Sequence, residues 1–401
     1  MPTLTDYTQF DGLHWETGTV RNYLDYCGAT APHTGKPYSE ALLMGISGGA
    51  VMGYFVFAYQ GIDPHARILT RNTFDPMETM LNRLGAEPNV RQTASAERAV
   101  GNLVETLESG TPAITWADAL SLPYEPHTYE FEFPHMQPVV VYGYDEEADL
   151  VSIADRSRVP LFSTTGQLAM ARSKVKKMRH RVMTLALPDP DRIPEAVRAG
   201  MRDSIQIFTE KPPKGARHNF GFAAYQRWAD ALRKPKMRGS WEKEFPPGRK
   251  MYAGLESVFS DTHTYGKEGF AERDVFADFL DEAAQILDRS VLREAGKRFR
   301  ESALAWRDLG KTLLPDSVPV WAEARELMLE NQRLFLEQGG EAVEAGQVNA
   351  DRLIAIRRQM ETEFPLSDEE VVALREEIAE QVSKISALEE PAVAAMKEAL
   401  A

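Results

Sequence analysis

The stretch LHWETGTVRNYLDYCG, residues 13–28, contains the only cysteine of the chain and one of its eight histidines. A thiol at the start of a helix is typical of cysteine-dependent acyl transfer, because the positive helix end lowers the pKa of the thiol and favours the nucleophilic thiolate. The residue at this start is Trp15, and Cys27 lies about 18 Å further along the expected helix. Cys27 also falls on the apolar face near the negative helix end, where the pKa of a thiol is raised. We therefore expect Cys27 to be a buried core residue rather than a nucleophile.

Three motifs in the first half of the chain belong together: HWETGTVRNYL (14–24), YSEALLMGISGG (38–49) and HMQPVVVYGYDEEADLVSIADRS (135–157). In this order they resemble the N-terminal domain of the butirosin biosynthesis protein H family, whose members look like papain-type cysteine peptidases rebuilt as acyltransferases. Two segments of the second half, EGFAERDVFADFLDEAA (268–284) and RESALAWRDLGKTLLPD (300–316), resemble the helical domain that commonly follows in that family. The resemblance covers most of the chain.

The resemblance implies a thiolate nucleophile, a histidine base on a neighbouring strand and an acid on the next strand that orients the imidazole. The family cysteine directly follows the first histidine, which is the position of Trp15. The family base precedes the glycine of GYD at the position of Gln137, and the orienting acid corresponds to Asp155. An indole cannot attack a carbonyl, and an amide cannot relay a proton at neutral pH. The resemblance therefore predicts that the catalytic cysteine and histidine are substituted and that the inherited thiol chemistry is absent.

Other side chains are candidates for the roles that remain. His135 precedes Gln137 by two residues, so in a strand both side chains point the same way and His135 could replace the lost base. Trp15 either fills the former active-site groove or lines it as an aromatic wall for a ligand. His127, in YEPHTYEFEF, is expected on a loop. The predicted catalytic residues are His135 and Asp155, and the predicted substrate-binding residues are His14, Trp15, Glu16, Gln137 and Ser47.

Two different chemistries are alternatives at the same residues. His14 and Glu16 flank Trp15, and with His135 they would supply two imidazoles and one carboxylate, a set used for non-haem iron or zinc. Ser47, in GISGG, formally matches the G-x-S-x-G nucleophile elbow, but that elbow needs a preceding strand and a following helix. The helix-like SEALLM precedes it here, so we expect close backbone packing at the glycines. No cofactor is expected.

Apolar spacing and β-branched runs predict the elements that position these residues. Helices are expected after ETG and over residues 76–84, 96–108 and 220–233. Strands are expected over residues 112–118, 137–145, 149–155 and 181–187. Early helices followed by antiparallel strands indicate an α+β domain. For residues 1–188 the resemblance implies that this α+β domain is papain-like.

Three prolines in LPDPDRIPEA, residues 187–196, mark a domain boundary. Beyond them strand signals nearly vanish, and residues 276–287 and 292–313 form apolar helical stripes. We therefore predict an all-α helical domain over residues 189–401, in the manner of a bundle. Its acidic, amphipathic end suits a terminal helix or a homo-oligomer contact.

Composition restricts the partners. The 401-residue chain is 43% hydrophobic with a formal net charge of −14, which argues against nucleic acid and against an anionic membrane surface. A single cysteine excludes an intramolecular disulfide.

Residues 41–59 have no charge but contain four glycines, so we expect a buried helix interrupted by a glycine turn rather than a membrane span. The first residues show no signal peptide, and a cytoplasmic location is expected.

Three functions follow from these observations. The first is an acyl or aminoacyl transferase of small-molecule biosynthesis that works without a cysteine, in which the site holds a thioester and an amine together and proximity supplies the rate. The second is a non-catalytic relative that binds a small molecule or an acyl carrier protein. The third is a metal-dependent enzyme that uses His14, Glu16 and His135.

Overall fold

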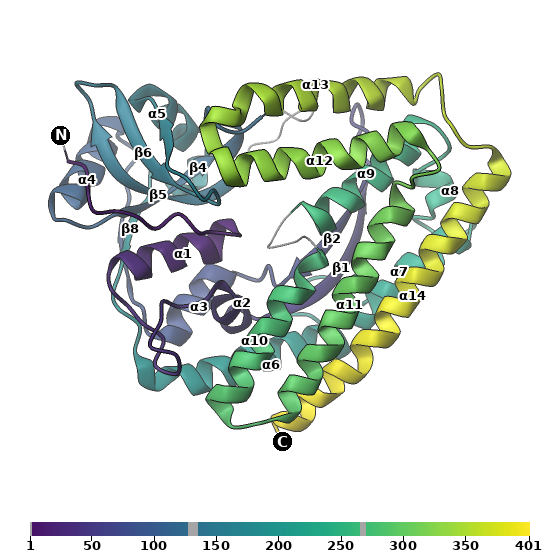
Figure 1. Ribbon diagram of the computed structural model, residues 1–401, viewed down its shortest axis with the longest axis horizontal. Coiled ribbons are helices and arrows are strands. Elements are labelled where there is room, and N and C mark those ends of the chain that lie inside the picture. The colour runs from purple at the N-terminus through teal and green to yellow at the C-terminus, as the bar shows by residue number, and fades with distance from the viewer. Residues whose placement is uncertain (1, 127–134, 265–269) are drawn as a thin grey trace. The chain divides into compact units, whose positions relative to one another are not determined.

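The computed structural model describes residues 2–126, 135–264 and 270–401 (Figure 1). Two compact units are present, and the chain passes between them repeatedly. The first unit comprises Met1–Leu43, Met80–Ile193 and Glu330–Asp351, and the second comprises Met44–Thr79, Pro194–Leu329 and Arg352–Ala401.

The first unit contains a six-stranded antiparallel sheet. Its strands, in spatial order, are β3 (Pro88–Arg91), β8 (Val182–Leu185), β4 (Ala113–Asp118), β5 (Met136–Asp145), β6 (Leu150–Ala154) and β7 (Leu161–Ser163). The central strand β5 is buried at nearly every position, from Gln137 to Tyr144. Such an unbroken buried run needs cover on both faces of the sheet.

Three helices of the first unit pack on this sheet: α1 (Trp15–Tyr26), α4 (Ala96–Glu108) and α5 (Thr165–Lys174). Several other helices begin in one unit and end in the other, among them α2 (Glu40–Ile46), α3 (Pro76–Leu84), α12 (Pro319–Gln338) and α13 (Val343–Gln359). The antiparallel sheet and the helices of residues 20–27, 76–84 and 96–108 confirm the predicted α+β character of this part of the chain.

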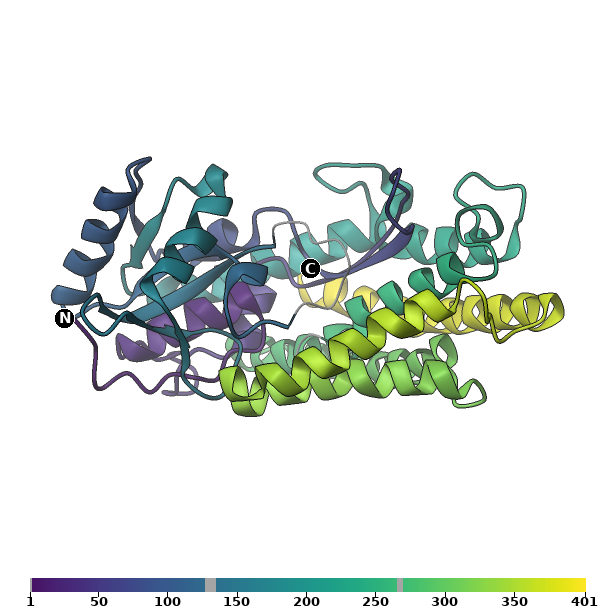
Figure 2. The same ribbon diagram turned by 90° about the horizontal axis from the view of Figure 1, so that it is seen from above.

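The second unit is a helical assembly with one β-hairpin. The hairpin strands are β1 (Ala50–Phe57) and β2 (His65–Arg71). The helices are α6 (Ile193–Thr209), α7 (Gly221–Arg233), α8 (Trp241–Glu244), α9 (Arg249–His263), α10 (Arg273–Leu287), α11 (Val291–Leu313) and α14 (Asp368–Ala399). Helices α11 and α14 run side by side, as Figures 1 and 2 both show. Their large buried side chains, such as Trp306 and Ile378, form the core of the unit.

Beyond Ile193 the described residues form helices and no strand, so the predicted helix-rich second half is confirmed. The predicted boundary after residue 188 lies close to one crossing between the units, at Ile193 and Pro194. A single boundary would assign residues 44–79 to the first unit and residues 330–351 to the second. In the structure, residues 44–79 belong to the second unit and residues 330–351 to the first.

The expected helix over residues 41–59 is wrong in its second half. Helix α2 ends at Ile46, and the chain turns at Gly48 and Gly49, whose φ angles are 114° and 69°. Only glycine adopts such angles readily, and the β-branched and aromatic sequence after the turn then forms strand β1. In the described part of the chain, no helix has the length and apolar character that crossing a membrane requires.

Candidate functional site

The start of α1 is built around a buried carboxylate. His14 is the N-cap of the helix, and its Nδ1 accepts a hydrogen bond from the main-chain N–H of Glu16 at 3.3 Å. The Glu40 carboxylate, from α2, accepts hydrogen bonds from the N–H groups of Leu13 and His14 and from the Thr17 hydroxyl. An anion at this place is stabilised by the free N–H groups and the positive end of the helix. Glu40 therefore supplies much of the negative charge that a thiolate would supply in a cysteine-dependent enzyme.

Trp15 is the first residue of α1 and touches two imidazoles. Its ring centroid lies 3.9 Å from that of His14 and 5.6 Å from that of His135, which it meets edge to face. Trp15 is half-buried. The other tryptophans of the chain are all buried: Trp116, Trp228, Trp241, Trp306 and Trp321. Trp15 is thus the one indole with a partly exposed surface.

Strands β5 and β6 bring Gln137 and Asp155 together. The Nε2 of Gln137 donates a hydrogen bond to Oδ2 of Asp155 at 2.9 Å, and both residues are buried. Gln137 occupies β5, and Asp155 directly follows β6, its neighbour in the sheet. The pair has the layout of a base and its orienting acid. The amide donates to the carboxylate as an imidazole would, but it cannot accept a proton from a nucleophile.

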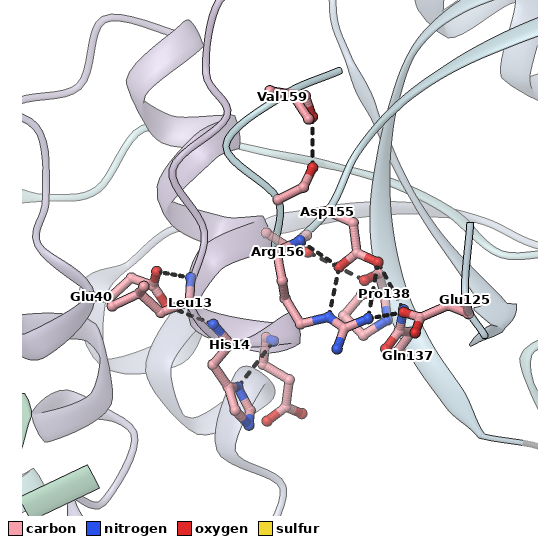
Figure 3. Close-up of polar contacts among 12 residues, drawn as sticks. Leu13, His14, Glu40, Glu125, Gln137, Pro138, Asp155, Arg156 and Val159 are labelled. Atoms are coloured by element: carbon pink, nitrogen blue, oxygen red, sulfur yellow. Dashed lines mark hydrogen bonds and ion pairs between the residues drawn. The ribbon is translucent and has the colours of Figure 1, made fainter. Parts of the chain in front are cut away.

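Asp155 has a second partner that compensates its charge. Its Oδ1 accepts hydrogen bonds from the main-chain N–H and the Nε of Arg156, at 2.7 and 3.1 Å. The same guanidinium bonds to the carboxylate of Glu125 (Figure 3). It also lies over the ring of Phe335, 4.9 Å from the ring centroid. Burial raises the pKa of Glu125, and the positive charge of Arg156 opposes that rise. The buried carboxylate of Asp155 is therefore paired without an imidazole.

His135 is held at the end of this network by its main chain. Its N–H donates to Oδ1 of Asp118 at 2.7 Å, and its carbonyl accepts from the N–H of Ala119 at 2.8 Å. Its side chain is exposed and contacts Trp15. Because His135 and Gln137 are two residues apart at the start of β5, the same strand presents both toward α1.

Helix α1 and strand β5 are joined directly. The Thr19 hydroxyl donates to the main-chain oxygen of Pro138 at 3.3 Å. This contact lies one helical turn from Trp15 and one residue from Gln137. The structure therefore brings His14, Trp15, His135, Gln137 and Asp155 to one region of the first unit.

Ser47 has a local structural role. It lies in the second unit, and its buried hydroxyl donates to the carbonyl of Met44 at 2.7 Å, at the end of α2. Its own carbonyl accepts from Nδ2 of Asn72. A helix precedes Ser47 and a strand follows it, which is the reverse of a nucleophile elbow. The predicted role of Ser47 in substrate binding stays a prediction.

Cys27 stands at the far end of α1, as its C-cap. It is a free, half-buried cysteine, so the expected full burial is wrong. Burial raises the pKa of its thiol, although the Tyr23 hydroxyl acts in the opposite direction. A thiol with a raised pKa is a poor nucleophile at neutral pH.

The predicted metal set is not formed. Within the described ranges, no group of three His, Cys, Asp or Glu side chains is placed to hold a metal ion. His14 is buried and uses its Nδ1 to cap α1. His127 lies outside the described residues.

Sequence reasoning missed three charged residues of the site: Glu40, Glu125 and Arg156. Glu40 stands in the second motif, YSEALLM, but its partner at the start of α1 is distant in the sequence. Arg156 directly follows Asp155, and an arginine beside a buried strand-end carboxylate is a usable signal for charge compensation. Glu125 carried no recognisable signal.

Two family models match the chain. The model described as Butirosin biosynthesis protein H, N-terminal, matches residues 14–156, and the model described as Domain of unknown function (DUF4872) matches residues 166–319. No curated protein matches the chain. The first match begins at His14 and ends at Arg156, so it spans the whole network described above.

Proposed function

Because the chain belongs to the butirosin biosynthesis protein H family, we propose that it binds an acyl-type small molecule at the start of α1 without forming an acyl-enzyme. The family suggests a role like that of the acyltransferases of small-molecule biosynthesis. The papain-like architecture that the resemblance implies supports a ligand position beside residues 15 and 137. The ligand is held there by contacts rather than by a covalent bond.

The observation that carries this proposal is the hydrogen bond between Gln137 and Asp155. In a cysteine-dependent site the corresponding imidazole must accept the thiol proton and later return it. Here an amide fills the position, and Arg156 satisfies the remaining charge of Asp155. Together with an indole in place of the thiol, this arrangement supports binding and disfavours an acyl-enzyme.

Trp15 supports a binding role for the same place. Its indole is partly exposed, and a flat aromatic surface provides a large contact area for an apolar or planar ligand group. The exposed imidazole of His135 lies at its edge and can donate or accept a hydrogen bond. An acyl group with an adjacent amide or amine would use both surfaces.

The test uses the acetyl thioester of N-acetylcysteamine as a soluble probe. Because the other five tryptophans are buried, quenching of fluorescence by acrylamide reports mainly on Trp15. We expect the probe to protect wild type from quenching and W15F to lose probe binding, measured independently by ligand-observed NMR. W116F, which changes a buried tryptophan, is the matched control and should bind as wild type does.

Intact-mass spectrometry of the same mixtures tests the absence of an acyl-enzyme. We expect the protein mass to stay unchanged after incubation with the thioester. A stable acetyl adduct at any side chain of this site, or equal probe binding by W15F and wild type, would contradict the proposal.

A second candidate function is thiol-independent acyl transfer, and the exposed imidazole of His135 beside Trp15 favours it. The site would hold a thioester and an amine, and His135 would remove the proton from the attacking amine. Aminolysis of the probe would then exceed the uncatalysed rate, and the excess would decrease at low pH because only a neutral imidazole can act as a base. H135Q would abolish that pH dependence. No acceleration in wild type would leave only the binding role.

A further inference from the structure

The segment between α5 and β8 is the most positively charged part of an acidic chain. Within residues 172–181, RSKVKKMRHR, there are six arginines and lysines and no acidic residue, whereas the whole chain has a net charge of −14. Lys176, Lys177 and Arg179 are exposed. None of these three forms an ion pair with a residue that the structure describes. Their charges therefore remain uncompensated at the surface of the first unit.

Arg172 is buried in the same segment and has no carboxylate partner. Only 3% of the residue is exposed, and its Nη2 donates to the carbonyl of His180 at 2.8 Å. Its buried Nε has no hydrogen-bond partner among the described residues. Burial lowers the pKa of Arg172 to about 10, and a nearby tyrosine, Tyr144, opposes that shift. A buried guanidinium without a counter-ion is costly in free energy.

Two other buried arginines of this protein are compensated by carboxylates. Arg273 bonds to Glu389, and Arg357 forms a two-point ion pair with Glu256. Arg172 differs from both because its Nη2 donates to a single main-chain carbonyl and it forms no ion pair with a residue that the structure describes. Arg172 therefore lacks the counter-ion that these two arginines have.

Arg375 provides a further comparison, since it also lacks a carboxylate bond among the described residues. Its Nη2 donates to the carbonyls of Trp241 and Phe245, which are the first residue and the C-cap of α8. Its buried Nε also has no hydrogen-bond partner among the described residues. Arg375 thus donates to two main-chain carbonyls, whereas Arg172 donates to one.

The loop that faces Arg172 has an unusual backbone. Arg179 and His180 both have positive φ angles, 48° and 47°, which non-glycine residues rarely adopt. The turn places the His180 carbonyl on Arg172 and leaves the Arg179 side chain in solvent. Strain of this kind persists when the surrounding structure imposes it, and it is common at ligand sites.

We propose that Arg172, Lys176, Lys177 and Arg179 form an anion site that binds the phosphate group of a small molecule. A phosphate monoester has a charge between −1 and −2 at neutral pH and several strong acceptor oxygens, so it matches a guanidinium without a counter-ion in a segment that carries the exposed cations Lys176, Lys177 and Arg179. A long polyanion is excluded by the acidity of the rest of the chain, whereas a small anion feels only the charges within about 10 Å.

This anion site adjoins the candidate functional site without depending on it. The Nζ of Lys174, in the same segment, lies 3.5 Å from Oδ2 of Asp118. The other oxygen of Asp118 accepts the hydrogen bond from the His135 main chain. A phosphate group bound at Arg172 would therefore belong to a ligand that extends toward His135, or to a separate effector.

The experiment measures thermal unfolding of the full chain with inorganic phosphate and with phenyl phosphate, against sodium chloride at equal ionic strength. Both phosphates should raise the melting temperature of wild type, and chloride should not. Phosphate binds only the folded state, so the shift yields an apparent dissociation constant. A larger effect of phenyl phosphate would identify an ester rather than free phosphate as the ligand.

Two variants and one control locate the site. R172M should lose at least tenfold in affinity for phosphate and should be at least as stable as wild type without phosphate, since the unpaired buried charge is gone. K176A/K177A changes only exposed residues and should lose affinity several-fold. K384A, an exposed lysine on α14, is the control and should behave as wild type does.

NMR titration of His180 gives a readout that is independent of stability. Burial and the charge of Arg172 lower the pKa of His180. Bound phosphate should raise that pKa again in wild type and leave it unchanged in R172M. An unchanged His180 pKa, a phosphate effect that persists in R172M, or chloride acting as well as phosphate would overturn the proposal.

Discussion

Both units contain a buried charged network, and the two networks differ in what surrounds them. In the second unit, Arg273 is fully buried and donates to Glu389, to the main-chain oxygens of Thr70 and Val51, and to the Tyr225 hydroxyl. These partners come from β1, β2, α7 and α14, so one guanidinium ties the hairpin to the helices. Every contact is internal.

In the first unit, the Gln137, Asp155 and Arg156 network lies beside a half-exposed indole and an exposed imidazole. Trp15 and His135 therefore have solvent-exposed surface next to the buried network. The comparison teaches that a buried ion pair alone does not identify a functional site, because such pairs also serve to hold elements together. The partly exposed aromatic and imidazole groups next to the pair distinguish the two cases.

The largest expected effect is in the second unit. Glu389→Ala leaves Arg273 buried without its counter-ion, and we expect a loss of about 3–5 kcal/mol in the free energy of unfolding. Glu376, on the same helix, pairs with Arg233 at the surface and is the matched control. E376A should lose at most about 1 kcal/mol. Denaturant unfolding measures both, and equal losses would contradict the structural role of Arg273.

The second prediction concerns pH, again in the second unit. Burial raises the pKa of Asp261 to about 6 from 3.8, so the native state holds this proton more tightly than the unfolded state. The stabilisation from Asp261 is therefore present below pH 3.8 and is lost as the pH rises through 6. Burial lowers the pKa of His263 to about 4 from 6.5, so its stabilisation is present above pH 6.5 and is lost as the pH falls through 4.

In wild type, the titrations of Asp261 and His263 have opposite effects on stability as the pH rises. In D261N only the His263 titration remains, and stability should rise between pH 4 and pH 6 by about 3 kcal/mol relative to wild type. Thermal or urea unfolding of D261N and of wild type, measured at several pH values in this range, gives the difference in stability. A D261N profile parallel to that of wild type would show that Asp261 does not titrate in this window.

A smaller effect is expected in the first unit. Gln137→Leu removes a hydrogen bond to a buried carboxylate that keeps its bonds to Arg156, and the expected loss is about 1.5–3 kcal/mol. Q137H should restore most of the stability, because an imidazole N–H can donate to Asp155. Urea unfolding of both variants separates the two outcomes. Equal loss in Q137L and Q137H would mean that the pair lacks the layout of a base and its acid.

The smallest effect is expected at Cys27. Its side chain is half-buried at the end of α1, so Cys27→Ala should change the free energy of unfolding by less than about 1 kcal/mol. Binding of the thioester probe should be unaffected. Loss of probe binding in C27A would place the thiol of Cys27 in the binding site. That result would contradict a site at the start of α1, because Cys27 lies at the other end of this helix.

Local patterns in the sequence predict the elements well where a single periodicity governs them. Helix α4 spans Ala96–Glu108, as its apolar spacing predicts, and the valines of β5 predict a strand that is buried on both faces. The hairpin of β1 and β2 was missed because the uncharged stretch around Gly48 also fits a buried helix. Only the turn at Gly48 in the structure distinguishes the hairpin from a continued helix.

Within the candidate site, the resemblance predicts positions 15, 137 and 155 together, and the structure joins 137 to 155. The charge partners could not be predicted in the same way. Glu40 reaches the start of α1 and Glu125 reaches Arg156 through tertiary contacts that no local spacing encodes. The lack of a counter-ion at Arg172 is likewise visible only once every neighbour is known.

We propose that the site keeps the geometry of a thiol-dependent site, with Trp15 in place of the thiol and Gln137 in place of the base. Rebuilding both in a C27A background, as W15C/Q137H, tests it most directly through the rate of alkylation by iodoacetamide as a function of pH. We predict that the new cysteine reacts with a pKa clearly below the 8.5 or so of a free thiol, and that W15C without Q137H does not. A rebuilt thiol that titrates like a free cysteine would show that residues 15 and 137 do not form a catalytic pair.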